Sequence, residues 1–152
     1  MATKTKTGRT PWTFREPGMA STSDMARQSA AIPIRNGQVC MVTSRSGRRM
    51  VIPKGNLEPN KTAGEIALQE AWEEAGLVGI LSPEPVGSYL YEKAGVTCHV
   101  LVFVLTVTRA AEVWPERMMR ERTWVDFAEA IQRTEEPDLR ELLRALMLRE
   151  PK

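Results

Sequence analysis

From residue 26 onward, apolar residues gather in two short segments, 26–35 and 38–44. Asn36-Gly37 lies between them, and this dipeptide is typical of the tight turn of a β-hairpin. We therefore predict a pair of antiparallel strands. Pro33 falls inside the first strand. Because proline has no N–H to donate to a sheet, it predicts an edge position or a bulge.

A second pair of apolar segments, 86–93 and 96–108, flanks Ala94-Gly95. The longer segment is apolar on both faces, which predicts a central strand buried on both sides of a sheet. Short apolar segments at 50–53 and 122–125 predict two further strands. Between these pairs, residues 54–62 are rich in turn-forming residues and predict a loop.

Residues 62–75 are predicted to form a helix with a signal at each end. Thr62 and Glu65 have the spacing of a capping box, and Gly76 supplies a C-terminal stop. Segments 126–132 and 138–149 predict two more helices, the second from leucines near helical spacing. Strands and helices do not alternate strictly, which predicts an α+β or mixed α/β layer fold.

The chain has 152 residues, which fits one domain over 26–152 preceded by a tail or arm over 1–25. No apolar run is long enough to cross a membrane, and the N-terminus lacks the apolar core of a secretory signal. Cys40 and Cys98 lie in apolar runs, where buried reduced thiols are expected, so we predict a cytoplasmic location. His99 is the only histidine, which excludes a His/Cys zinc site.

Charge is divided unevenly along the chain. Residues 1–50 hold nine basic and two acidic residues, a net +7, and residues 51–152 hold twelve and seventeen, a net −5. This division predicts a basic surface facing an anion beside an acidic cluster with its own role. It excludes a uniformly basic nucleic-acid coat and a uniformly acidic disordered chain.

The acidic cluster lies on the predicted helix. Glu70, Glu73 and Glu74 are spaced i, i+3 and i+4, so they share one face and repel one another. Leu68, Ala71, Trp72 and Ala75 are expected on roughly the opposite side, against a sheet. A solvated acidic face is one interpretation. A hard divalent cation, Mg²⁺ or Mn²⁺, is the other, because it prefers oxygen ligands and would neutralise the repulsion.

Residues 55–77, GNLEPNKTAGEIALQEAWEEAGL, resemble the Nudix box, in which a glycine, three glutamates, a second glycine and an aliphatic residue stand at fixed spacing. Gly55, Glu70, Glu73, Glu74, Gly76 and Leu77 match in register. Lys61 stands where the family has glutamate, and Gln69 where it has arginine. Residues 27–147 more loosely resemble the diphosphoinositol polyphosphate phosphohydrolase branch and its bacterial relatives.

The resemblance implies a mixed sheet between helices and hydrolysis of a diphosphate bond. It assigns Mg²⁺ to Glu70, Glu74 and the carbonyl of Gly55 or its neighbour, and a base or water-orienting role to Glu73. Glu116 or Glu121 is a further candidate ligand or base, with an exposed loop charge as the alternative. Together the residues predict an enzyme, with a non-catalytic ligand sensor as the alternative from another class.

The expected substrate is a small polyphosphate: a diphosphoinositol polyphosphate, a dinucleoside polyphosphate or a related nucleotide. ADP-ribose, a nucleotide sugar or an RNA 5′ end are alternatives, and no other nucleic acid or membrane partner is expected. Basic residues before the box are candidates to bind its phosphates: Arg27, Arg45, Arg48, Arg49 and Lys54. Trp114 and Trp124 are expected to pack in the core or at its rim. The oligomeric state stays open, with a homodimer among the alternatives.

Overall fold

The computed structural model describes residues 25–150, which form eight strands and three helices. The strands are β1 (Met25–Arg35), β2 (Gln38–Thr43), β3 (Met50–Val51), β4 (Lys54–Asn56), β5 (Leu77–Leu81), β6 (Gly87–Lys93), β7 (Val96–Ala110) and β8 (Arg122–Asp126). The helices are α1 (Ala63–Ala75), α2 (Phe127–Arg133) and α3 (Pro137–Arg149). The arm predicted over 1–25 lies almost wholly outside the described residues and stays a prediction.

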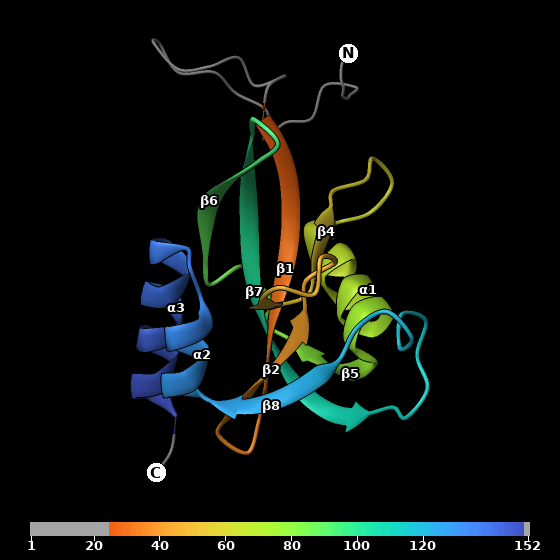
Figure 1. Ribbon diagram of the computed structural model, residues 1–152, viewed down its shortest axis with the longest axis vertical. Helices are drawn as coiled ribbons and strands as arrows, with labels where there is room; N and C mark the ends of the chain where they lie inside the picture. The colour runs from red at the N-terminus through yellow and green to blue at the C-terminus, as the bar shows by residue number, and fades with distance from the viewer. Residues whose placement is uncertain (1–24, 151–152) are drawn as a thin grey trace.

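All eight strands join one mixed sheet, with the central order β3-β2-β1-β7-β5 and with β4, β6 and β8 paired to β1, β7 and β2. The β1–β7 pair is parallel and the other pairs are antiparallel. Helix α1 lies on one side of the sheet, and α2 and α3 lie on the other (Figure 1). The predicted α/β/α sandwich is confirmed. Within residues 25–150, none of the helices has the length and apolar content of a membrane-spanning helix.

Both predicted hairpins form at the predicted turns. Asn36 and Gly37 adopt φ angles of 55° and 74°, and Ala94 and Gly95 adopt 53° and 79°. These left-handed conformations match the twist of the flanking strands. β7 is central, as predicted, because it pairs with β1 along one edge and with β5 and β6 along the other.

The prediction for Pro33 is wrong, because β1 is a central strand. The edge of β1 to which the Ala31 N–H points faces β4, and this N–H donates to Pro53 O at 3.1 Å. From Ile34 onward the same edge faces β2. Pro33 lies two residues beyond Ala31 and therefore on the same side, in the interval where β1 passes from one partner to the other. A missing donor is tolerated there.

Two short strands were not predicted. Lys54–Asn56 lies in the segment expected to be a loop, yet it forms β4 against β1. Leu77–Leu81 forms β5 against β7, with an irregular register between Val78 and Gly79. Both depend on the partner strand more than on local sequence, since β-propensity is strongly context-dependent.

Side chains of the central strands alternate between two cores. One core lies under α2 and α3 and includes Ile32, Val39, Met41, Val100, Leu139 and Leu143. The other lies under α1 and includes Ala31, Cys40, Val42, Ala67, Ala71, Phe103 and Leu105. Because successive residues of a strand point to opposite faces, neighbours such as Ala31 and Ile32 enter different cores. The second core fixes α1 against the sheet.

Candidate active site

Helix α1 begins with the predicted capping box. The Glu65 N–H donates to Thr62 Oγ1 at 3.1 Å, and the Thr62 N–H donates to Glu65 Oε1 at 2.8 Å. Buried Ser29 on β1 donates its hydroxyl to Ala63 O at 2.6 Å. These contacts fix the start of the helix to the sheet.

The buried face of α1 differs from the predicted one. Ala67, Ala71 and Ala75 are fully buried, whereas Leu68 is 39% exposed. Glu74 follows Ala67 by seven residues and Ala71 by three, so it shares their face and is only 6% exposed. The glutamates therefore do not all lie opposite the apolar face, and one of them is enclosed by it.

The three predicted glutamates lie in the last two turns of α1. Burial raises the pKa of Glu74 to about 8, with the carboxylates of Glu70 and Glu116 adding to this effect and Arg120 opposing it. Burial also raises the pKa of Glu70, with the Glu74 carboxyl opposing this shift and the charge of Glu73 adding to it. The site thus holds carboxylates close together in a poorly hydrated place, where an added cation would favour their charged forms.

Gly55 packs directly against Glu70. A Cβ atom at position 55 would lie 2.4 Å from Glu70 Cδ, so only glycine leaves room for this carboxylate. Gly55 is in β4 and is paired with Ser29 of β1. The sheet therefore brings the backbone at Gly55 to the carboxylate, as the predicted site requires.

The two residues that depart from the box pattern contact each other. Lys61 Nζ donates to Gln69 Oε1, and Lys61 also lies 4.0 Å from Glu58 Oε1. A hydrogen bond from the Gln69 side chain lowers the pKa of the neighbouring Glu70, opposing the effect of burial. The paired substitution thus preserves a polar contact beside the glutamates.

Arg120 contacts the candidate site, and sequence reasoning missed it. Its side chain is 8% exposed, and its Nε lies 2.7 Å from Glu116 Oε1. Its other two nitrogens lie 3.6 Å from Glu74 Oε2 and 2.9 Å from Thr43 O. Glu116, considered from sequence as a loop charge, is therefore tied to the glutamate cluster through Arg120. The sequence signal is weak, because Arg120 lies in a loop without periodicity.

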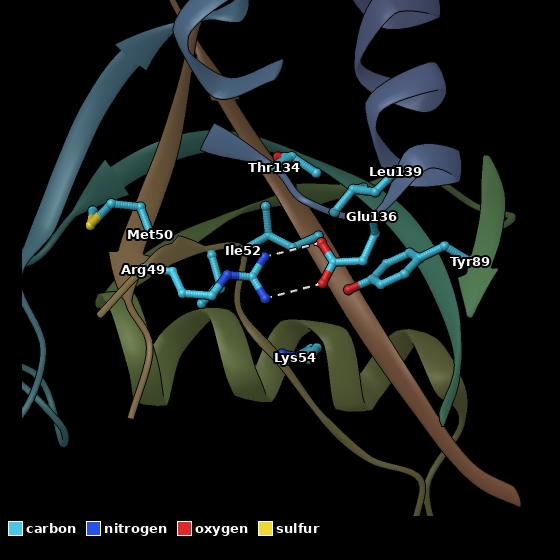
Figure 2. A pocket seen from close by; sticks show the side chains of 9 residues that line it. Arg49, Met50, Ile52, Lys54, Tyr89, Thr134, Glu136 and Leu139 are labelled. Carbon is cyan, nitrogen blue, oxygen red and sulfur yellow. Dashed lines mark hydrogen bonds and ion pairs between the residues drawn. The ribbon is translucent and has the colours of Figure 1, made fainter. Parts of the chain in front are cut away.

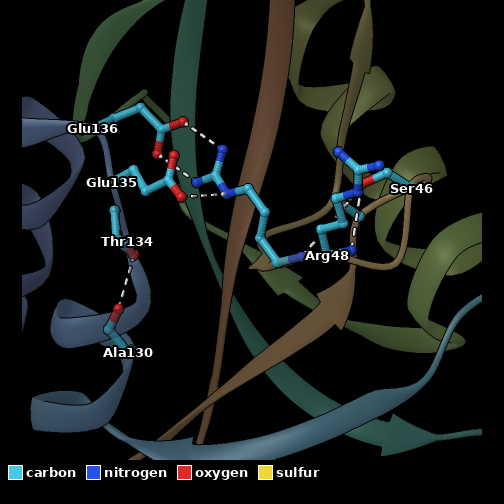
Figure 3. Close-up of polar contacts among 8 residues, drawn as sticks. Ser46, Arg48, Ala130, Thr134, Glu135 and Glu136 are labelled. Atoms are coloured by element: carbon cyan, nitrogen blue, oxygen red, sulfur yellow. Dashed lines mark hydrogen bonds and ion pairs between the residues drawn. The ribbon is translucent and has the colours of Figure 1, made fainter.

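A small open pocket lies between the β2–β3 connection, β6 and the start of α3 (Figure 2). Arg49 faces Glu136 across it in a paired contact of 3.1 and 3.2 Å (Figure 2). Arg49 Nε lies 3.6 Å from Oε2 of Glu135, which lies beside Glu136 (Figure 3). Lys54 lines the same pocket, 5.2 Å from the centre of the Tyr91 ring. Burial lowers the pKa of Lys54, and the charge of Glu74 opposes that shift.

The other predicted basic residues lie elsewhere. Arg45 and Arg48 are exposed on the turn between β2 and β3. Arg27 is partly buried on β1 opposite His99 of β7. The structure therefore brings Arg49 and Lys54 together in one pocket and leaves the other three outside its lining. Arg49 is neutralised there by two glutamates that sequence reasoning did not connect to it.

Comparison with known proteins shows the family of this chain. The family model of the NUDIX domain matches residues 25–146. The chain belongs to the Nudix hydrolase family. Its fold agrees, since a NUDIX hydrolase from Nitrosomonas europaea superposes with a TM-score of 0.64 at 19% identity, over 78% of this chain and 86% of that one.

Two relatives illustrate the similarity of sequence to other Nudix proteins. Nudix hydrolase 12, mitochondrial, of Arabidopsis thaliana is 39% identical over 103 residues, which are 62% of this chain and 51% of that protein. Diphosphoinositol polyphosphate phosphohydrolase 3-beta of Bos taurus is 33% identical over 100 residues, 64% of this chain and 60% of that protein. The chain thus spans about half to two thirds of the curated Nudix relatives it matches.

The Nudix family generally uses a divalent metal, and the residues here fit one. Among residues 25–150, no group of three or more His, Cys, Asp and Glu side chains is arranged to hold an ion by itself. Mg²⁺, however, usually takes one or two carboxylates together with water and substrate phosphates. Glu70 and Glu74, with the space left by Gly55, match that smaller donor set.

Proposed function

We propose that this chain is a divalent-metal-dependent pyrophosphohydrolase. The observation that carries the proposal is the placement of Glu70 and buried Glu74 one turn apart near the end of α1, with Gly55 packed against Glu70. Two carboxylates held this close would bind a divalent cation in their charged forms, and the same cation can bind a diphosphate. Membership of the Nudix hydrolase family supports the same reaction.

In the proposed reaction, water attacks one phosphorus atom of a diphosphate and the bridging P–O bond breaks. Glu70 and Glu74 would hold Mg²⁺ or Mn²⁺, with a carbonyl at Gly55 as a further ligand. When bound, the ion would neutralise the diphosphate and stabilise the charge that develops on it. Glu73 would accept the proton of the attacking water, since it lies on the same helix and is half-buried.

The proposed substrate is a polyphosphorylated small molecule, namely a diphosphoinositol polyphosphate, a dinucleoside polyphosphate or a related nucleotide. Lys54 supports this class, because it lines the pocket and because the charge of Glu74 raises its pKa, against the effect of burial. The similarity to the Bos taurus diphosphoinositol polyphosphate phosphohydrolase supports it as well. Arg27, Arg45, Arg48 and Arg49 remain candidate phosphate contacts, with Arg49 available only when it leaves Glu135 and Glu136.

A hydrolysis screen tests the activity. Purified full chain is incubated with Mg²⁺ or Mn²⁺ and diphosphoinositol phosphates, dinucleoside polyphosphates, ADP-ribose, nucleoside triphosphates or 5′-triphosphate RNA, and the products are resolved chromatographically. We expect metal-dependent cleavage of a diphosphate bond in the first two classes. Tight binding without turnover of any substrate would instead support a ligand sensor.

Glu73→Gln tests the role of the base. Turnover should fall by about 10²-fold or more with the fold retained, because the variant cannot accept a proton. Glu141→Gln is the matched control, since Glu141 is 70% exposed on α3 and remote from the cluster in sequence. Turnover of Glu73→Gln at the wild-type rate would remove Glu73 from this role.

A cytoplasmic location is also proposed. Cys40 and Cys98 are buried and unpaired with each other, as expected in a reducing compartment. Several relatives carry mitochondrial in their names and one carries chloroplastic, so the location needs its own test. Microscopy of the full chain with a C-terminal fluorescent tag in its own cell should show diffuse cytoplasmic signal, and concentration in an organelle would overturn the proposal.

A further inference from the structure

The last turn of α1 carries Glu73 and Glu74. The terminal turns of helices tend to fray. The final carbonyl groups of a helix have no partner within it. In α1, the Gly76 N–H satisfies Trp72 O at 2.9 Å, with Gly76 in the left-handed conformation at φ 67°. The helix has no basic residue in its last turn to serve the remaining carbonyls.

Three consecutive carbonyls receive donors from residues 114–122, which we call the capping segment. The Glu116 N–H donates to Glu73 O at 2.9 Å, and Trp114 Nε1 donates to Glu74 O at 3.0 Å. A guanidinium nitrogen of Arg122 donates to Ala75 O at 2.8 Å. Each carbonyl of the last turn therefore has a partner outside the helix.

The donors also support one another. The Arg122 guanidinium lies 4.2 Å from the centre of the Trp114 ring, a distance suited to a cation–π contact. The ring packs on Gly76 so closely that a Cβ atom there would lie 2.8 Å from Trp114 Cδ2. Arg122 also places a positive charge at the negative end of the helix dipole, which favours the helical state.

The capping segment also contacts the Glu74 carboxylate through one of its side chains. Arg120 connects Glu116 of the segment to Glu74 and to Thr43 O of β2. Thr43 makes two further hydrogen bonds, both with Glu121. The Thr43 N–H donates to Glu121 O at 3.1 Å, and the Glu121 N–H donates to Thr43 Oγ1 at 3.0 Å. The capping segment is thus fixed to the sheet as well as to the helix.

We propose that the capping segment positions Glu73 and Glu74 for the reaction, and that Trp114, Arg120 and Arg122 are positioning residues. They act through the backbone carbonyls of α1 and the Glu74 carboxylate. The inference rests on the proposed function for its effect on turnover, because misplacing a reacting group by about 1 Å costs about 10²-fold in rate. Its structural part, the fixing of the last turn, stands independently of any activity.

Trp114→Phe tests this proposal, because it removes the donor to Glu74 O and keeps an aromatic ring on Gly76. Three quantities are measured: backbone amide exchange along α1, Mn²⁺ affinity by electron paramagnetic resonance, and steady-state kinetics. We expect exchange at 73–76 to rise about fivefold, corresponding to one lost hydrogen bond. Mn²⁺ affinity should fall by about fivefold and turnover by about tenfold, with substrate KM within about twofold of wild type.

Trp124→Phe is the matched control. Trp124 is likewise partly buried and stacked with an arginine, Arg35 at 4.7 Å, but it lies on β8 and donates to no carbonyl of α1 in the described residues. We expect no local change in exchange at 73–76 and no change in Mn²⁺ affinity. Arg122→Met should behave like Trp114→Phe, and Arg122→Lys should restore much of the loss because lysine can still donate to Ala75 O.

The outcomes separate the two proposals. Local exchange and Mn²⁺ affinity that are unchanged in Trp114→Phe would overturn the positioning role, as would a uniform rise in exchange along the whole of α1. A wild-type protein without turnover on any substrate would overturn the proposed function, while the exchange measurement would still decide the positioning role.

Discussion

The N-terminal end of α1 is stabilised by residues next to it in the chain, whereas its C-terminal end is stabilised by a segment forty positions further on. Thr62 and Glu65 cap the start reciprocally within one turn. Trp114 caps Glu74, and Arg122 caps Ala75 from a sequence distance of 47. The glutamates lie towards the second end, so the proposed reaction would depend on contacts between segments that are far apart in the chain.

The largest effect on the glutamate end of α1 is expected for Gly55→Ala. The added Cβ would overlap Glu70 Cδ, and the flexible carboxylate would move aside with little cost to the fold. Turnover should fall by about 10²-fold and Mn²⁺ binding should weaken, because Glu70 leaves its place. Steady-state kinetics measures the turnover, and thermal unfolding measures the stability of the fold. Glu141→Gln is the control, because Glu141 is 70% exposed on α3. Its turnover should stay at the wild-type rate, and unchanged turnover in Gly55→Ala would contradict the contact.

A double-mutant cycle on Lys61 and Gln69 addresses the contact beside the glutamates. Lys61→Glu directs a carboxylate at Gln69 Oε1, and Gln69→Arg directs a second cation at Lys61. Each single variant should lower turnover by about tenfold, and the double variant should recover most of it because opposite charges then face each other. The coupling is measured from kcat/KM and Mn²⁺ affinity of the four proteins. Additive losses would show that the two side chains act independently.

Thr62→Ala has a smaller effect that should stay confined to stability. Removing the capping hydroxyl costs about 1 kcal/mol of folding free energy. In a chain of this size the Tm should fall by about 2–4 °C. Turnover at 25 °C should stay within about twofold of wild type, because the glutamates lie at the other end of α1. A much larger loss of turnover than of stability would mean that the two ends are not separable.

The smallest effect concerns the pH dependence of the metal-free protein. The pKa of Glu74 is raised to about 8, so the folded state holds this proton more tightly than the unfolded state. The stability gained from it is present at low pH and is lost as the pH rises through about 8. In EDTA, the Tm should fall between pH 6.5 and 8.5, and less so in Glu74→Gln. Parallel curves for the two proteins would contradict the burial of this carboxylate.

Much of the fold follows from the sequence because its signals are local. Asn36-Gly37 and Ala94-Gly95 specify hairpin turns through positive φ angles, and Thr62 with Glu65 specifies a helix start. β4 was missed for the opposite reason, since its three residues become a strand only beside β1. Pro33 was misjudged because its cost depends on which neighbour β1 has at that point.

In the candidate site, too, local spacing can be recognised in the sequence, whereas contacts between distant segments cannot. The box spacing predicts the glutamates and Gly55 as site residues, and the structure brings Gly55 to Glu70. Sequence could not connect Arg49 with Glu136, which lie 87 positions apart, or assign Arg120 to Glu74. The burial of Glu74 was predictable from its spacing to Ala67 and Ala71, but charge dominated the interpretation of that face. Contacts between distant segments are set by the packing of the sheet, and a single sequence does not display them.

The central claim is that Glu70 and Glu74, in the C-terminal half of α1, hold the metal ion. Mn²⁺ binding tests this claim most directly. Electron paramagnetic resonance measures free Mn²⁺ during titration of the wild type, Glu70→Gln, Glu74→Gln and the surface control Glu141→Gln. We predict one site in the wild type and the control, weakened by at least about tenfold in each of the other two. Equal affinity in all four proteins would contradict the account.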